Sequence, residues 1–184
     1  PKNYDRMIEI YEALADYGYR EVGQEYLQNV LNTDKKLDTY DSGRIYYYLG
    51  DYQKAYLALE EAKGKGGVDS YLYLGKAYAA TGDYNYASSV YSNYLSKQGP
   101  DAEIYNQLGL CEMAKKDYQK ALEAFQAGKQ IEGNSLMQTL SFNEIVAYEY
   151  LQDYQKAAVL LKAYLQNYPD DQAAIREQQF LSTR

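Results

Sequence analysis

The chain reads Asp117-Tyr118-Gln119-Lys120-Ala121 near its middle, and the same five letters occur at residues 51–55 and 153–157. A variant, Asp83-Tyr84-Asn85-Tyr86-Ala87, lies between the first two copies. The copies begin at residues 51, 83, 117 and 153, so their spacings are 32, 34 and 36 residues. A recurrence of this period indicates a repeat protein, in which each repeat covers the apolar face of its neighbour. The 184 residues leave room for about five repeats.

Tyrosine is the unusual feature of the composition. The chain has 25 Tyr but 3 Phe and no Trp, within an apolar content of 46%. A Tyr ring combines a large apolar area with a polar rim, so it suits half-buried layers. Two interpretations stay open. Tyr is the general packing aromatic of the repeats, or part of the set is enriched for recognition of a partner.

The charge of the chain limits its partners. The formal net charge is −7 and the pI is about 4.7. The sequence has no cluster of Lys and Arg of the kind that neutralises phosphates. We therefore expect neither nucleic acid nor an anionic membrane surface as a partner, and a basic or apolar polypeptide fits better.

Residue types that carry catalysis are scarce. The chain has no His, which removes His-based acid–base chemistry, Ser-His and Cys-His pairs and His metal sites. The single cysteine, Cys111, excludes an intrachain disulfide, and its place in a predicted helix favours a buried, unreactive thiol. We expect no catalytic residues, no cofactor and no metal site. A buried carboxylate with a strongly raised pKa in a closed pocket would revive an enzymatic interpretation.

The sequence leaves the cellular location open. No apolar run reaches the ~20 residues that span a bilayer, and no signal sequence is visible. The sequence begins at Pro1 rather than Met, so we expect a trimmed or processed chain, and for an extracytoplasmic domain we expect that an N-terminal signal or anchor was removed. The expectation is a soluble domain, cytoplasmic or extracytoplasmic, with no membrane insertion by this segment.

The repeat between residues 68 and 101 reads as two paired helices. Tyr71, Leu74, Gly75 and Tyr78 follow the spacing of one helix stripe. Gly82 then ends the first helix, since glycine accepts the left-handed conformation that follows a helix. Asp83 caps the start of the second helix by accepting free backbone N–H groups. The apolar stripe of that second helix consists of Ala87, Tyr91, Tyr94 and Leu95.

This pattern resembles the tetratricopeptide repeat (TPR) family. Tyr71-x2-Leu74-Gly75-x2-Tyr78 and Ala87-x3-Tyr91 match its signature, with Tyr in place of the usual Trp and Phe. The resemblance implies an all-α fold, a right-handed superhelix (solenoid) of five helical hairpins. The expected single domain, 1–184, divides into a degenerate repeat at about 3–35, repeats at 36–67, 68–101, 102–136 and 137–169, and a capping helix at 170–181 with Ile175, Phe180 and Leu181 as its apolar contacts.

Three departures from the family pattern are visible. Glu112 stands where the family prefers Tyr, and Lys116 replaces the turn glycine. The second helix of the 36–67 repeat looks short, because it runs into the glycine-rich stretch 64–67. In the 137–169 repeat, Glu144-Ile145 takes the Leu-Gly place in one register, and a one-residue shift is the alternative.

The resemblance also implies a binding face. In TPR proteins the first helices of the repeats line the concave side of the superhelix. Three positions per helix, spaced i, i+4 and i+7, should form one stripe there. The candidate peptide-binding residues are Tyr40, Arg44, Tyr47, Leu72, Lys76, Ala79, Asn106, Leu110 and Met113. The alternative is that Tyr47, Leu72 and Leu110 merely pack neighbouring repeats.

We therefore expect a non-catalytic module that binds a protein or peptide, with apolar, aromatic or basic segments as the ligand. The family's clamp for acidic C-terminal tails needs paired cations, and Arg44 and Lys76 are isolated on this face. The alternative function is structural: self-assembly through the solenoid ends or through exchange of the C-terminal tail, giving a weak homo-oligomer.

Overall fold

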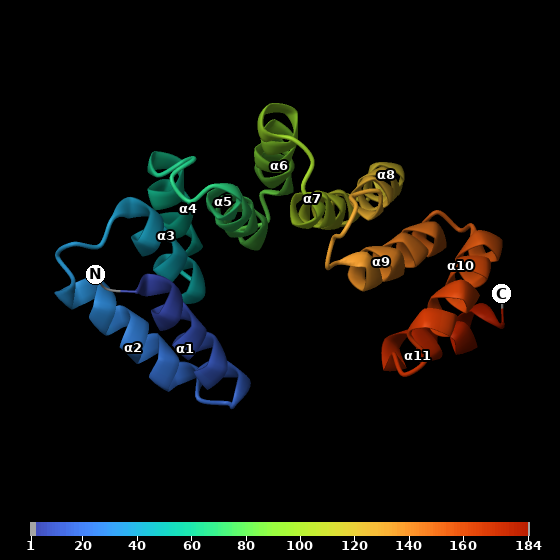
Figure 1. Cartoon of the computed structure of the whole chain (residues 1–184), viewed down its shortest axis with the longest axis horizontal. Helices are drawn as coiled ribbons and strands as arrows, with labels where there is room; N and C mark the ends of the chain where they lie inside the picture. The colour runs from blue at the N-terminus through green and yellow to red at the C-terminus, as the bar shows by residue number, and fades with distance from the viewer. Residues whose placement is uncertain (1–2, 184) are drawn as a thin grey trace. The chain divides into compact units, whose positions relative to one another are not determined.

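The computed structural model describes residues 3–183, and these residues form α-helices with no strand among them (Figure 1). The helices are α1 (Tyr4–Asp16), α2 (Arg20–Thr33), α3 (Thr39–Tyr48), α4 (Tyr52–Glu61), α5 (Val68–Ala80), α6 (Tyr84–Gln98), α7 (Ala102–Ala114), α8 (Tyr118–Lys129), α9 (Met137–Tyr150), α10 (Tyr154–Asn167) and α11 (Gln172–Leu181). The predicted all-α repeat fold is confirmed. Within the described residues, no helix is both long and apolar enough to cross a membrane.

The chain divides into two compact units, one up to Ala87 and one from Ser88 onward. In the first unit α1 packs on α2 and α3 on α4, and in the second α7 packs on α8 and α9 on α10. α11 packs on α10. Each pair is the expected helical hairpin. The grouping of the hairpins into one domain, with the repeat boundaries given above, stays a prediction.

A left-handed residue lies in each of the turns that join α1 to α2, α3 to α4, α5 to α6, α7 to α8 and α9 to α10. Gly18, Gly50 and Gly82 have φ of +87°, +79° and +85°. Lys116 and Gln152 take the same place with φ of +63°. A residue other than glycine is strained at positive φ. Lys116 and Gln152 adopt it all the same, so the turn keeps its conformation where the glycine is replaced.

An aspartate caps the second helix of four hairpins, as predicted. The Oδ1 atoms of Asp51, Asp83, Asp117 and Asp153 each accept a hydrogen bond from the backbone N–H three residues later, at 3.0–3.3 Å. These bonds satisfy one of the donors that every helix start leaves free. The first hairpin has Tyr19 at this position, without a side-chain cap.

Small residues allow the two helices of a hairpin to approach closely. A Cβ atom on Gly109 of α7 would lie 2.6 Å from Cδ1 of the buried Phe125 in α8. A Cβ atom on Gly43 of α3 would lie 2.6 Å from Cγ of Leu59 in α4. The glycines of the repeat signature are therefore contact points between helices.

The departures in the sequence have structural counterparts. α4 has ten residues and ends at Glu61, before the glycine-rich stretch. Glu112 is buried, and its Oε1 receives a charged hydrogen bond from Lys115 Nζ at 2.8 Å. Glu144 is buried too and is bound by Lys129 Nζ at 2.5 Å and Gln126 Nε2 at 2.8 Å. Each buried carboxylate thus has a cationic partner, which offsets the cost of its burial.

The unshifted register holds in α9. Glu144 and Ile145 are both buried, and Tyr148 packs against the neighbouring core cluster.

The end helix α11 buries only one of its two last apolar side chains. Leu181 is buried against α10, but Phe180 leaves 40% of its surface exposed. Phe180 lines a cavity beside α10, and its role as an apolar contact of the capping helix stays a prediction.

Candidate functional site

The candidate site is the stripe of i, i+4 and i+7 side chains on the first helix of each hairpin, here called the first-helix face. In the first unit, α3 contributes Tyr40, Arg44 and Tyr47, and α5 contributes Leu72, Lys76 and Ala79. In the second unit, α7 contributes Asn106, Leu110 and Met113. The use of these residues in binding stays a prediction. The structure shows how far each side chain is buried and which residues it contacts.

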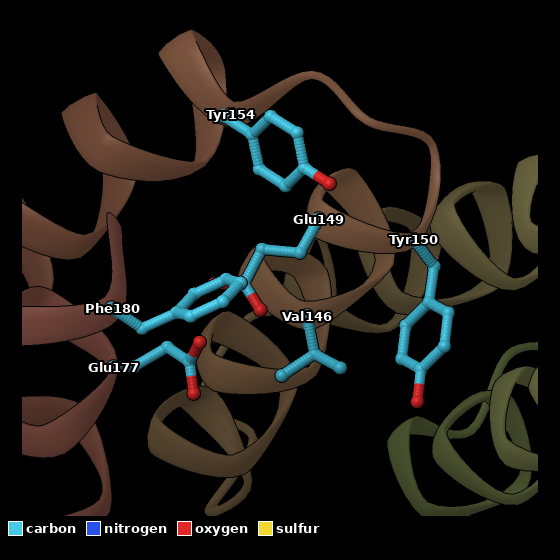
Figure 2. Close-up of a pocket in the computed structure, with 6 residues that line it drawn as sticks. All are labelled: Val146, Glu149, Tyr150, Tyr154, Glu177 and Phe180. Carbon is cyan, nitrogen blue, oxygen red and sulfur yellow. The ribbon is translucent and has the colours of Figure 1, made fainter. Parts of the chain in front are cut away.

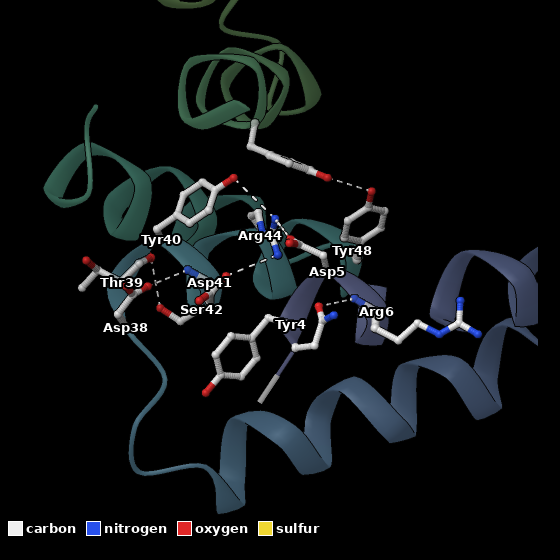
Figure 3. A network of polar contacts seen from close by, with 12 residues as sticks. Tyr4, Asp5, Arg6, Asp38, Thr39, Tyr40, Asp41, Ser42, Arg44 and Tyr48 are labelled. Carbon is white, nitrogen blue, oxygen red and sulfur yellow. Dashed lines mark hydrogen bonds and ion pairs between the residues drawn. The ribbon is translucent and has the colours of Figure 1, made fainter. Parts of the chain in front are cut away.

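Arg44 is a structural charge in the unbound chain. Its side chain is 6% exposed, and Nη1 lies 2.6 Å from Asp5 Oδ1 of α1 while Nη2 lies 3.3 Å from Asp41 Oδ1 (Figure 3). The guanidinium also lies over the Tyr40 ring, 4.8 Å from its centroid. Arg44 therefore ties α3 to α1 and presents no free positive charge on the face.

Tyr47 belongs to an aromatic group. Its ring centroid lies 5.5–5.7 Å from those of Tyr48, Tyr52 and Tyr73, the last on α5. Tyr48 donates a hydrogen bond to Glu12 Oε1 at 2.6 Å. Burial, followed by this bond, raises the pKa of Tyr48, so its hydroxyl stays protonated and donating. The group is half-buried, so it both joins α3 to α5 and offers aromatic surface.

The three α5 positions are half-buried, and the α7 positions divide in character. Asn106 is buried and accepts a hydrogen bond from Asn143 Nδ2 of α9 at 2.9 Å. Leu110 is 42% exposed. Met113 packs against the cluster around Phe125. Leu110 is thus the α7 side chain with the most surface to offer a ligand.

The sequence reasoning missed the equivalent positions of α9. Glu149 precedes Asp153 by four residues, as Tyr47 precedes Asp51, so Phe142, Val146 and Glu149 complete the face. The cap spacing was the signal that could have found them. Val146 and Glu149 open into a cavity of about 530 Å³ (Figure 2). Its lining residues are Val146, Glu149, Tyr150, Tyr154, Glu177 and Phe180.

Two carboxyl groups meet in this cavity. Burial, then the charge of Glu177, then a hydrogen bond between the two groups raise the pKa of Glu149 from 4.5 to about 7. That hydrogen bond needs one carboxyl to be protonated. When both are ionised, Oε1 of Glu149 is buried with no donor within the described part of the chain.

Cys111 is buried, as predicted, and burial raises the pKa of its thiol to about 11. A thiol with this pKa is protonated near neutral pH and is a poor nucleophile. Among residues 3–183 no group of three or more His, Cys, Asp or Glu side chains is placed to hold a metal ion.

Comparisons with known proteins agree with the helical pattern. Two family models, each described as tetratricopeptide repeat, match residues 72–135 and 142–171, together about half of the chain. A search of curated proteins found no match.

Several solved structures share the fold. The TPR protein TTC0263 from Thermus thermophilus is 15% identical with a TM-score of 0.73, over 99% of this chain and 100% of that one. YrrB, described as a TPR protein with an unusual peptide-binding site, is 20% identical with a TM-score of 0.65, over 96% and 92%. The second TPR domain of human RPAP3, solved with the HSP70 peptide SGPTIEEVD, is 15% identical with a TM-score of 0.54, over 60% and 90%. At these identities the likeness concerns the fold alone, but with the family models and the repeat signature it shows that the chain belongs to the tetratricopeptide repeat family.

Proposed function

We propose that the chain is a non-catalytic scaffold that binds an extended peptide along its first-helix face. The observation that carries the proposal is the contrast between recurrent and variable positions. Ala55, Ala121 and Ala157 recur at the hairpin joints and are fully buried. The face positions differ from helix to helix, and apart from the buried Arg44 and Asn106 they keep exposed surface, most of all at Leu110. Variation at accessible positions of a constant frame suits recognition of a partner.

The energetics require several anchors. Burying one large apolar side chain contributes roughly 1.5–3 kcal/mol. A micromolar complex needs about 8 kcal/mol net, and association and ordering cost several more. Four anchors fall in this range. Each unit offers two large apolar side chains on its first helices, Tyr47 and Leu72 in the first unit and Leu110 and Val146 in the second. Two of the solved relatives support the proposal, since one is described with a peptide-binding site and one holds a peptide.

The ligand we expect is apolar or aromatic with basic residues. Arg44 is paired with Asp5 and Asp41, so one of the two cations on this face, Arg44 and Lys76, is not available to an acidic peptide. Glu149 is the carboxylate whose raised pKa could suggest catalysis. Its cavity is rimmed by Tyr150, 56% exposed, and Phe180, so water reaches it. None of its described lining residues is a Ser, Thr, Cys or Lys nucleophile. A binding role therefore fits this carboxylate better than a catalytic one.

The test is capture from a peptide array by the parent chain and by a Tyr47→Ala/Leu72→Ala/Leu110→Ala variant. A Leu57→Ala/Tyr86→Ala/Val159→Ala variant is the matched control, because it truncates well-exposed apolar side chains on second helices. We expect the first variant to lose capture and the second to keep it, with both folded by circular dichroism. Equal capture by a folded first variant would remove the first-helix face from the proposal.

Self-assembly is the competing structural role. Exchange of the C-terminal tail would have to withdraw Leu181, which is buried in its own unit, so this route is disfavoured. Light scattering against concentration distinguishes the two roles. A chain that stays monomeric at high micromolar concentration supports the peptide scaffold, and concentration-dependent growth supports assembly.

A further inference from the structure

The cavity between α9, α10 and α11 has a composition that points to a particular ligand. Its six described lining residues include two carboxyl groups and three aromatic rings, and none is Lys or Arg (Figure 2). We propose that this cavity binds the cationic side chain of a lysine or arginine in the peptide. The proposal rests on the proposed function, and it names the chemistry of one ligand residue.

The geometry places both acids at the same spot. Figure 2 shows the Glu149 side chain of α9 and the Glu177 side chain of α11 reaching toward each other, with Phe180 beside them. When both carboxyl groups are ionised, the Oε1 atom of Glu149 is buried and accepts no hydrogen bond from the described residues. A buried carboxylate oxygen without a donor is costly, and a cation with N–H groups supplies what it lacks.

The fold does not need acids at this position. The equivalent contact in the first unit joins Tyr47 of α3 to Tyr73 of α5, with ring centroids 5.6 Å apart. Tyr73 lies three residues after the buried Ser70, as Glu177 lies three residues after the buried Ala174. Two rings fill this place in one hairpin pair and two carboxyls occupy it in another. Two neighbouring carboxyl groups repel each other and lower the stability of the fold, whereas a pair of packed rings does not. This cost in stability favours a role in binding for the two acids.

The aromatic walls favour an organic cation over a metal ion. The rings of Tyr150, Tyr154 and Phe180 can receive an ammonium or guanidinium group by cation–π contact, and they match the alkyl stem of Lys or Arg. A divalent ion needs about six oxygen ligands, and the cavity offers two carboxyl groups close together. The net charge of −7 acts in the same direction by attracting basic peptides.

The test uses three blocked pentapeptides, Ac-Ala-Ala-X-Ala-Ala-amide, with Lys, Arg or the uncharged norleucine at X. They are titrated into the full chain at pH 8 and followed by amide chemical shifts. We expect the Lys and Arg peptides to shift Val146, Glu149 and Glu177, and norleucine to bind at least about tenfold more weakly. Glu149→Gln and Glu177→Gln should each weaken the Lys peptide by a similar factor. Glu132→Gln, an exposed acid outside the cavity, should leave it unchanged.

Binding should also depend on pH. The titratable groups that face the cavity are Glu149 and Tyr150 from α9, Tyr154 from α10 and Glu177 from α11. A carboxyl with a pKa of about 7 goes from about nine-tenths to about one-tenth ionised between pH 8 and pH 6. The Lys peptide should therefore bind about tenfold more weakly at pH 6, and Glu149→Gln should lose this dependence.

The outcomes separate this inference from the proposed function. Equal binding of the Lys and norleucine peptides, unchanged binding by Glu149→Gln, or shifts spread over surface acids would overturn the cation site. If array capture still depends on Tyr47, Leu72 and Leu110 in that case, the scaffold function stands without the cation site. Displacement of the Lys peptide by low-millimolar Ca²⁺ would assign the cavity to a metal instead. Lys-specific shifts without array capture would keep the cation site and remove the extended peptide.

Discussion

Replacing Glu149 by Gln should stabilise the chain above neutral pH. Gln keeps the size and hydrogen-bonding capacity of the side chain but removes the charge that Glu177 repels. The folded state raises the pKa of Glu149 above its unfolded value of 4.5, to about 7. The folded chain therefore holds the Glu149 proton more tightly than the unfolded chain between these two values. The parent loses stability as the pH rises from 4.5 to 7, and the variant does not.

The size of the effect follows from the same shift. A shift of one pKa unit corresponds to about 1.36 kcal/mol, so the full difference between 4.5 and about 7 would give about 3 kcal/mol. The cavity is open to water, which screens the two charges, so we reduce the expected value to about 1 kcal/mol. The quantity to measure is the difference in free energy of unfolding between variant and parent.

Urea denaturation at pH 4, 6 and 8 measures this difference while other titrating groups cancel. We expect the advantage of Glu149→Gln over the parent to grow by about 1 kcal/mol from pH 4 to pH 8. Glu132→Gln, at an exposed position outside the cavity, is the control and should show no growth. A constant difference for Glu149→Gln, or a difference that reverses in favour of the parent at pH 8, would refute the reasoning.

Three further predictions concern the frame. Gly109→Ala should lower the free energy of unfolding by about 1 kcal/mol, because the clash with Phe125 outweighs the helix preference of Ala; a more stable variant in urea would contradict the close approach. Asp153→Ala should cost about 1 kcal/mol in the same assay and Asp153→Asn much less, because Asn still caps α10; equal losses would argue against capping. Arg44→Ala should cost about 2 kcal/mol, because it removes the charged hydrogen bond from the buried guanidinium to Asp5, whose own carboxylate is exposed; lost peptide capture at unchanged stability would make Arg44 a binding residue instead.

The sequence predicted the frame well because the frame repeats. Asp83 and Gly82 mark the same turn as Asp51 and Gly50, so a local rule read once applies to several hairpins. Even Lys116 could be assigned to its turn from spacing alone. Helix type, hairpin pairing and capping depend on residues within a few positions of one another, and such contacts are visible in a sequence.

The sequence could not predict how side chains of different hairpins meet. Arg44 is 39 residues from Asp5, and no spacing rule shows that the two form an ion pair that consumes the charge. The sequence could predict only one of the two acids in the cavity. The position of Glu149 follows from its distance to the capping Asp153, but Glu177 lies on an end helix that no capping residue follows. Its position depends on how α11 packs on α10.

The most direct test of the central claim locates a bound peptide on the folded chain. A captured peptide carrying a nitroxide spin label is added to methyl-labelled protein, and the broadening of each methyl signal is measured. We predict strong broadening at Leu72, Leu110 and Val146, which lie on first helices, and little at Leu57 and Val159, which lie on second helices. Broadening at Leu57 and Val159 with unaffected Leu72, Leu110 and Val146 would contradict a scaffold that binds peptides on its first-helix face.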